Sequence, residues 1–151
     1  MFRSHVAFSL IIGLLTFKFF NLNPYIYISL IMFFGIFIDL DSSKSYIGKK
    51  LGILSQIINF IFGHRKIFHS IWFTLALSIG AYFLINGYFI AVLIGSLSHL
   101  ILDSLTREGI MPFYPIKYKI NGVFKTNGFF ELIFFICLII INFVLLFNII
   151  F

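Results

Sequence analysis

Long apolar runs with few charges are the feature that most constrains how this chain can fold. Only 11% of its 151 residues are charged and 61% are hydrophobic, with 23 phenylalanines. A soluble domain does not have this composition, and in lipid the backbone must satisfy its own hydrogen bonds, which favours helices. We therefore predict an all-α integral membrane protein of one domain with about five transmembrane helices. The predicted spans are about 5–20, 24–39, 67–85, 88–105 and 129–150.

The connections between these spans differ in character. The segment 46–62 mixes Gly, Lys, Ser, Gln and Asn with apolar residues, which predicts an amphipathic helix lying at the membrane interface. The stretch 107–128 is rich in proline, glycine and Asn-Gly, which predicts an irregular loop or short hairpin at the surface. The single cysteine, Cys137, excludes a disulfide framework and a thiolate metal site.

The distribution of basic residues predicts the orientation in the membrane. Ten of the eleven Lys and Arg residues fall at the N-terminus or in the connections 40–66 and 106–128, and Lys18 alone lies in the connection 18–24. The positive-inside rule then places these ten residues, and the N-terminus, in the cytoplasm of a cell with the protein in its inner or plasma membrane. With five spans, the C-terminus is expected outside.

All histidines and acids fall at the same predicted end of the spans. Such groups are costly in hydrocarbon, so their collection at one membrane face predicts a metal site rather than scattered helix ends. The residues are His5, Asp39, Asp41, His64, His69, His99, Asp103, Glu108 and Glu131. Glu108 lies in a Thr-Arg-Glu-Gly segment and is expected to be a solvated loop residue. Asp41 also fits a plain role as a helix cap.

The residue types and spacings favour a divalent metal. His99 and Asp103 are four residues apart and share one helix face. Imidazole and carboxylate together suit zinc, manganese or iron rather than calcium alone. The four carboxylates Asp39, Asp41, Asp103 and Glu131 balance two divalent ions, and a third ion would complement a phosphate. Arg65, Lys66 and Arg107 stand beside this set and are candidates to bind a phosphate or an anionic head group.

Several motifs in this order resemble the YdjM-type family of predicted membrane-bound metal-dependent hydrolases. They are Ser-His at residues 4–5, Ile-Asp-Leu-Asp at 38–41, Gly-His-Arg-Lys-Ile-Phe-His-Ser at 63–70, Ser-His-Leu-Ile-Leu-Asp at 98–103 and Asn-Gly-Phe-Phe-Glu at 127–131. One departure is Phe-Ile before Asp39, where the family has a small residue and a proline, and it leaves the end of the second span open.

The family is thought to be related to zinc-dependent phospholipases C and zinc nucleases. The resemblance implies the ligands His5, Asp39, His64, His69, His99, Asp103 and Glu131. It implies that Asp41 is a ligand or orients a histidine.

The leading functional hypothesis is a membrane-bound hydrolase that uses two or three divalent ions, most simply zinc, to activate water against a phosphoester. The catalytic candidates are Arg65 and Asp41. Arg65 would hold the phosphate, with Lys66 or Arg107 assisting. The expected partners are membrane lipid and a phosphate-containing substrate, without nucleic acid. Alternatives are a non-catalytic metal-binding membrane protein or a metal transporter, although the far halves of the spans lack the polar residues that transport needs. A basic membrane module that binds nucleic acid or anionic lipid is a third hypothesis.

Overall fold

The computed structural model describes residues 1–43, 45–63 and 65–150, and all regular structure in these ranges is helical. The elements are α1 (Phe2–Thr16), η1 (Phe17–Phe19), α2 (Pro24–Phe37), η2 (Ile38–Asp41), α3 (Tyr46–Leu51), α4 (Ile53–Phe62), α5 (Ile71–Ile85), η3 (Asn86–Tyr88), α6 (Phe89–Ser104) and α7 (Phe129–Ile150). The short 3₁₀ turns η1 and η2 extend α1 and α2, and η3 joins α5 to α6.

Four helical segments of the described chain are long and apolar enough to cross a membrane. They are Phe2–Phe19, Pro24–Asp41, Ile71–Ser104 and Phe129–Ile150. The 34-residue segment contains both the third and the fourth predicted spans, which pack against each other as α5 and α6 around the turn η3. The Ser78 hydroxyl donates to the Phe89 carbonyl at 3.1 Å and helps to close this turn. The predicted all-α membrane fold is confirmed, and the count of about five spans is approximate.

The helices begin where the sequence supplies caps. The Asn23 side chain accepts hydrogen bonds from the backbone N–H groups of Tyr25 and Ile26, and Pro24 occupies the first turn of α2. Ser70 accepts from the N–H of Phe73 and starts α5 at Ile71, four residues later than the sequence suggested. His69 therefore lies in the turn before α5 rather than within it.

The predicted interfacial helix is two helices with a break at Gly52. Gly52 has φ of +57°, a left-handed conformation that other residues adopt at a cost, and it separates α3 from α4. The polar side of α4 faces inward: the Ser55 hydroxyl donates to the Leu40 carbonyl at 2.8 Å, and the Asn59 amide donates to the Asp41 carbonyl at 2.6 Å. The apolar residues of α4 consequently lie on its exposed side.

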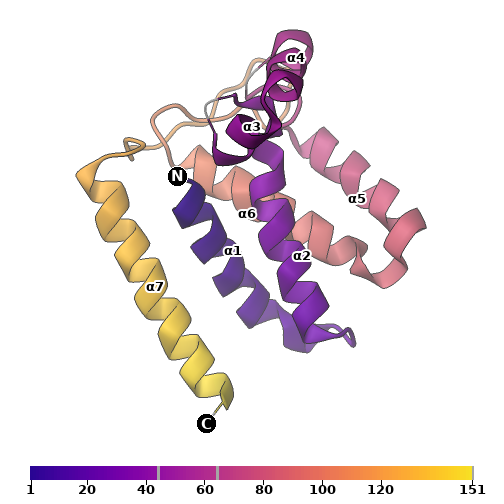
Figure 1. Ribbon diagram of the computed structural model, residues 1–151, viewed down its shortest axis with the longest axis vertical. Helices are drawn as coiled ribbons and strands as arrows, with labels where there is room; N and C mark the ends of the chain where they lie inside the picture. The colour runs from indigo at the N-terminus through magenta and orange to yellow at the C-terminus, as the bar shows by residue number, and fades with distance from the viewer. Residues whose placement is uncertain (44, 64, 151) are drawn as a thin grey trace.

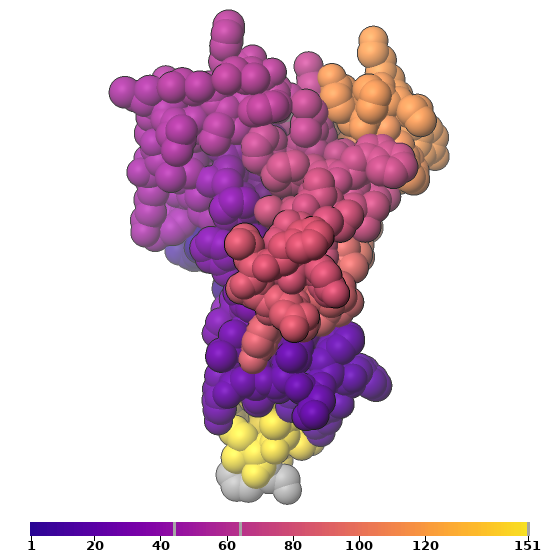
Figure 2. Space-filling view, turned by 90° about the vertical axis from the view of Figure 1, so that its right-hand side faces the viewer, coloured from indigo at the N-terminus to yellow at the C-terminus, as the bar shows by residue number. Residues whose placement is uncertain are grey.

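The helices α1, α2, α5 and α6 form the bundle, and α6 packs against the other three. Helix α7 packs chiefly along α1 and stands at one side (Figure 1). The start of α1, the end of α2 and the helices α3 and α4 share one end of the molecule. Figure 2 shows α3 and α4 (magenta) at this end and the C-terminal end of α7 (yellow) at the opposite end.

The predicted surface loop is an irregular hairpin. Ile110 and Ile120 exchange two backbone hydrogen bonds of 2.9 Å, and the N–H of Arg107 donates to the Phe124 carbonyl at 2.8 Å. The N–H of Ile71 donates to the Pro112 carbonyl, which ties the start of α5 to this loop. The hairpin therefore covers the end of the bundle where the predicted site residues collect.

Candidate metal centre

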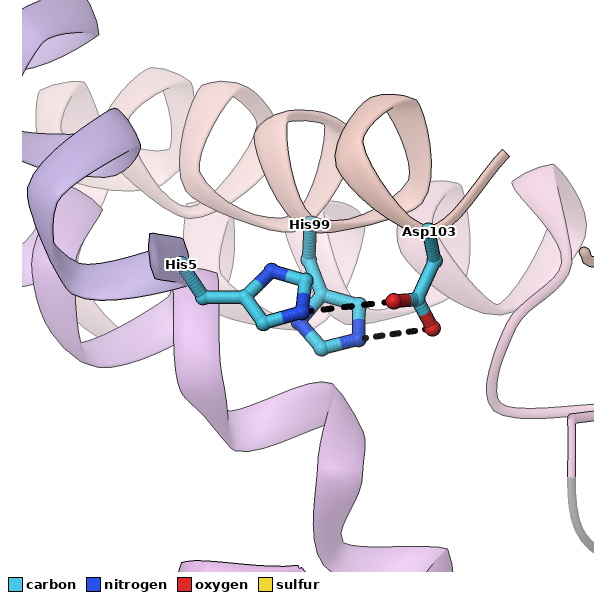
Figure 3. A group of neighbouring side chains, drawn as sticks. All are labelled: His5, His99 and Asp103. Carbon is cyan, nitrogen blue, oxygen red and sulfur yellow. Dashed lines mark ion pairs between the residues drawn. The ribbon is translucent and has the colours of Figure 1, made fainter. Parts of the chain in front are cut away.

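Three of the predicted ligands meet between α1 and α6. His5, in the first turn of α1, stacks on the imidazole of His99 with ring centroids 4.1 Å apart. Its Nε2 lies 3.3 Å from Oδ1 of Asp103, one turn beyond His99 on α6 (Figure 3). The three residues are almost completely buried, and one ligand atom from each lies within 4.8 Å of the others. This is a spacing at which a metal ion can be held.

A second group of three shares His99 with the first. Nε2 of His99 lies 3.9 Å from Oδ1 of Asp39, and Nε2 of His69 lies 3.8 Å from the same oxygen. The two imidazole Nε2 atoms are 3.3 Å apart. Oδ2 of Asp103 lies 3.3 Å from Nε2 of His69, so Asp103 joins the two groups. Five predicted ligands thus converge from α1, η2, the turn before α5 and α6.

The outer nitrogens of two histidines are held by other groups. Nδ1 of His99 donates to the backbone carbonyl of Gly35 at 2.8 Å, which leaves Nε2 as its free ligand atom. Nδ1 of His69 lies 3.4 Å from Oδ2 of the fully buried Asp41, and that oxygen also accepts from the Arg65 N–H at 2.8 Å. Contacts of this kind orient metal-binding imidazoles and raise their basicity. The geometry favours the orienting role for Asp41 over direct ligation.

Small residues allow α1, α2 and α6 to approach closely enough for these contacts. A Cβ added at Gly35 would collide with the Ser9 side chain, and Ser9 and Ser98 share a hydrogen bond of 2.9 Å. A Cβ added at Gly95 would lie 2.6 Å from the Ile31 carbonyl oxygen. Close backbone approach through small residues is the usual way in which membrane helices pack. It brings the Gly35 carbonyl within reach of His99.

The centre has a strongly anionic environment. Burial lowers the pKa of His69, but the carboxylates of Asp103 and Asp41 outweigh burial and raise its pKa to about 9. Carboxylates that favour a positive charge on His69 favour a bound cation for the same reason.

Arg65 lies at the edge of the centre, with φ of +56° and a side chain 15% exposed. Its guanidinium is 3.2 Å from Oδ2 of Asp103 and 3.3 Å from Oε2 of Glu108. It also donates to the hydroxyl of Thr106 at 3.3 Å and the carbonyl of Gly109 at 3.2 Å. The pairing of Arg65 with Glu108 was not foreseen, because an exposed acid in a glycine-containing loop gives no signal in the sequence.

The other predicted residues lie outside the five-residue cluster. Glu131 accepts hydrogen bonds from the Ser4 hydroxyl at 3.2 Å and from the Asn127 N–H, beside His5 but not within either group of three. The side chains of Lys66 and Arg107 are exposed. His64 lies outside the described residues, so its predicted ligand role stays a prediction.

The donor set fits a transition metal or zinc. Asp103 is 1% exposed, yet neither of its carboxylate oxygens accepts a well-aligned hydrogen bond from a described residue. Oδ1 faces Nε2 of His5 at 3.3 Å, and Oδ2 faces Nε2 of His69 at 3.3 Å and the Arg65 guanidinium at 3.2 Å. Buried carboxylates are costly unless cations compensate them, and Arg65 supplies a single positive charge to the several carboxylates of this cluster. Nitrogen and oxygen donors together match zinc, manganese or iron.

The model of the YdjM inner membrane protein family matches residues 1–150, which is nearly the whole chain. The chain belongs to the YdjM family. It is 35% identical over 101 residues to the uncharacterized protein YvsG of Bacillus subtilis, covering 62% of this chain and 61% of that protein. It is 33% identical over 88 residues to the inner membrane protein YdjM of Escherichia coli, covering 54% of this chain and 45% of that protein.

The Shigella flexneri protein of the same name matches to the same extent. The chain thus spans about half to three fifths of the length of these relatives. No solved structure matches it. The family assignment and the apolar helices agree in making it a membrane protein.

Proposed function

We propose that this YdjM-family chain is a membrane-bound, metal-dependent hydrolase that cleaves a phosphoester at the membrane surface. The observation that carries the proposal is the convergence of His5, Asp39, His69, His99 and Asp103 from four separate elements. Polar residues that only mark the ends of membrane helices would not be expected to converge, because such residues are most stable when they face water.

The arrangement suits more than one ion. Nε2 of His99 is common to both groups of three, and one nitrogen lone pair binds one ion. Asp103, by contrast, directs Oδ1 toward His5 and Oδ2 toward His69, so its two oxygens could serve both groups. Two ions, with His64 and Glu131 as further candidate ligands, would agree with the two or three divalent ions expected from charge. Zinc is the leading candidate, and manganese and iron fit the same donors.

Such ions lower the pKa of a water molecule and stabilise the charge that develops on a phosphoryl group. The side chains and backbone of the protein would orient the metal ligands and bind the substrate. Asp41 holds His69 in place, and the Gly35 carbonyl fixes the tautomer of His99. Arg65 stands 3.2 Å from Asp103 with a side chain that is 15% exposed, and it would bind the phosphate of a substrate. Lys66 and Arg107 are exposed nearby in sequence and would add positive potential for an anionic substrate.

The exposure of one side of the candidate centre favours a catalytic metal site over a purely structural one. His69 and His99 are fully buried and Asp103 is 1% exposed, whereas the Asp39 side chain is 22% exposed. A structural site is closed by protein ligands on all sides, and a catalytic site keeps one position open. The Asp39 side is the side from which substrate and water would enter.

The orientation that we propose places this end of the molecule in the cytoplasm. Lys18, in η1, lies at the end of the molecule opposite the candidate metal centre. In the sequence, the other ten basic residues fall at the N-terminus and in the connections 40–66 and 106–128. The positive-inside rule favours this orientation, with the C-terminus outside. The substrate would then be a phosphate-containing molecule at the cytoplasmic membrane surface.

Metal content tests the proposal most directly. Protein purified without chelator is expected to carry two or three divalent ions per chain by elemental analysis, and His99→Ala is expected to lose most of them. The matched control is Ser78→Ala, which removes a buried hydroxyl from the same helical hairpin but no ligand. Wild-type protein free of metal would refute the metal centre. Metal-loaded protein without chelator-sensitive activity on phosphomonoesters and phosphodiesters would refute the hydrolase.

A further inference from the structure

A continuous groove runs along α1 and α7. It consists of three hollows of about 440 Å³ each. Phe2, Arg3 and Phe135 line both the first and the second hollow, and Leu10 and Leu146 line both the second and the third. Because successive hollows share walls, they form one groove that starts beside Arg3 and ends near the start of α2.

The groove changes from polar to apolar along its length. The end near Arg3 is also lined by Ser4, Tyr46, Asn127 and Glu131. Beyond it, nearly all of the lining is apolar. That lining includes Val6, Ala7, Leu10, Ile139, Phe143 and Leu146. A ligand that fits this groove has a polar head and a long apolar tail.

The groove is longer than one leaflet. Its lining on α1 runs from Arg3 to Phe17, fourteen residues or about 21 Å at 1.5 Å per residue. Half of a hydrocarbon core of about 30 Å is about 15 Å, so a lipid anchored at Arg3 would occupy the part of the groove nearest its polar end. The polar end also lies at the end of the molecule where the helices present their charged residues, which is where a lipid head group lies.

The polar end favours a negative head group. Both carboxylate oxygens of Glu131 accept hydrogen bonds, from Ser4 and from Asn127, so this acid is already compensated. Within the described part of the chain Arg3 forms no ion pair, and its side chain is exposed. The Lys50 ammonium lies 4.8 Å from the ring centre of Tyr46, another lining residue, and adds a second positive charge.

The contact between α1 and α7 is narrow, which leaves the groove open. Ala7, Ile11 and Leu138 form its core. The Asn142 amide donates to the carbonyls of Ala7 and Leu138 at 2.9 Å and holds the two helices together within the apolar layer. A tail lying in the groove would contact both helices and widen this contact.

We propose that the groove between α1 and α7 binds one anionic phospholipid, with its phosphate at Arg3 and an acyl chain along Val6, Leu10 and Ile139. The site borders the metal centre at Glu131, and its occupancy does not require metal. The lipid fastens α7 to the bundle, since α7 packs chiefly against α1.

Native mass spectrometry of the full chain in mild detergent, treated with chelator, tests the proposal. The probes are phosphatidylglycerol and phosphatidylcholine with the same acyl chains. Wild-type protein is expected to retain one phosphatidylglycerol and to prefer it at least fivefold. Val6→Trp fills the groove and is expected to reduce retention at least tenfold. The matched control Val144→Trp adds the same bulk at an exposed position of α7 outside the groove and should leave retention unchanged.

A second variant tests the contact between Arg3 and the lipid head group, and its result does not depend on whether Val6→Trp folds. Arg3→Gln is expected to abolish the preference for phosphatidylglycerol, and Lys125→Gln, an exposed lysine outside the groove, is expected to keep it. Equal lipid retention by Val6→Trp and Val144→Trp would overturn the proposal, as would an unchanged preference in Arg3→Gln. If the wild-type protein is a dimer and Val6→Trp is a monomer, the groove would instead be assigned to a second copy of the chain. Because the metal is removed, these results are independent of the proposed hydrolase.

Discussion

At the scale of single residues, the candidate metal centre includes atoms that orient its candidate ligands as well as the candidate ligands themselves. The carbonyl of Gly35 and the carboxylate of Asp41 each hold the outer nitrogen of a histidine. The residues of the cluster could be predicted from the sequence, because histidines and acids are rare in apolar helices. The Gly35 carbonyl could not, because every residue has a carbonyl and only the close packing of α2 and α6 selects this one.

Asp41→Asn tests the orienting role. The amide keeps the shape of the side chain but removes the charge that favours His69 in its present position, so metal affinity is expected to fall about 10- to 100-fold. The measurement is competition with a chelator of known affinity. Glu108→Gln is the control, because Glu108 is 59% exposed and contacts Arg65 rather than a histidine. An Asp41→Asn affinity within twofold of wild type would show that Asp41 does not orient a ligand.

At the scale of elements, the membrane spans and the surface hairpin could be predicted from the composition of each segment, but the packing of the helices against one another could not. Hydropathy places a helix in the membrane without specifying which face meets which neighbour. The inward-facing polar side of α4 is an example: Ser55 and Asn59 bind carbonyls at the end of α2, and the apolar residues face outward. The sequence pattern predicts an amphipathic helix in either orientation.

Gly95 tests whether close packing of α6 on α2 positions the centre. In Gly95→Ala the new Cβ would lie 2.6 Å from a backbone oxygen of Ile31, which cannot move without shifting α2. Overpacking of this kind costs about 1–3 kcal/mol, so we expect a lower Tm in detergent. His99 lies one turn away, so weaker metal binding is also expected. Gly80→Ala is the control, because a Cβ there meets no atom within 4 Å and alanine favours the helix. Equal Tm values for the two variants would contradict a packing role for Gly95.

At the scale of the whole molecule, the asymmetry seen in the sequence is an asymmetry of the fold. His5, Asp39, His69, His99 and Asp103 gather at one end of the bundle because adjacent spans run in alternating directions. Glu131 was predicted in the same layer and lies beside it, since it binds Ser4 rather than a histidine. Alternation fixes the depth of a residue in the membrane, but its lateral position depends on which helices are neighbours. Helix α7 lies at one side of the bundle and packs chiefly against α1 (Figure 1).

The same asymmetry predicts which end faces the cytoplasm. Ten of eleven basic residues belong to segments at the site end, so a thiol placed there should be shielded from reagents outside the cell. In a Cys137→Ala background, Gln56→Cys on α4 is expected to react with a membrane-impermeant maleimide only after the cells are permeabilised. Asn21→Cys, exposed between α1 and α2 at the other end, is expected to react in intact cells. The reverse labelling pattern would place the metal centre outside the cell, and the substrate would then be sought on the outer membrane surface.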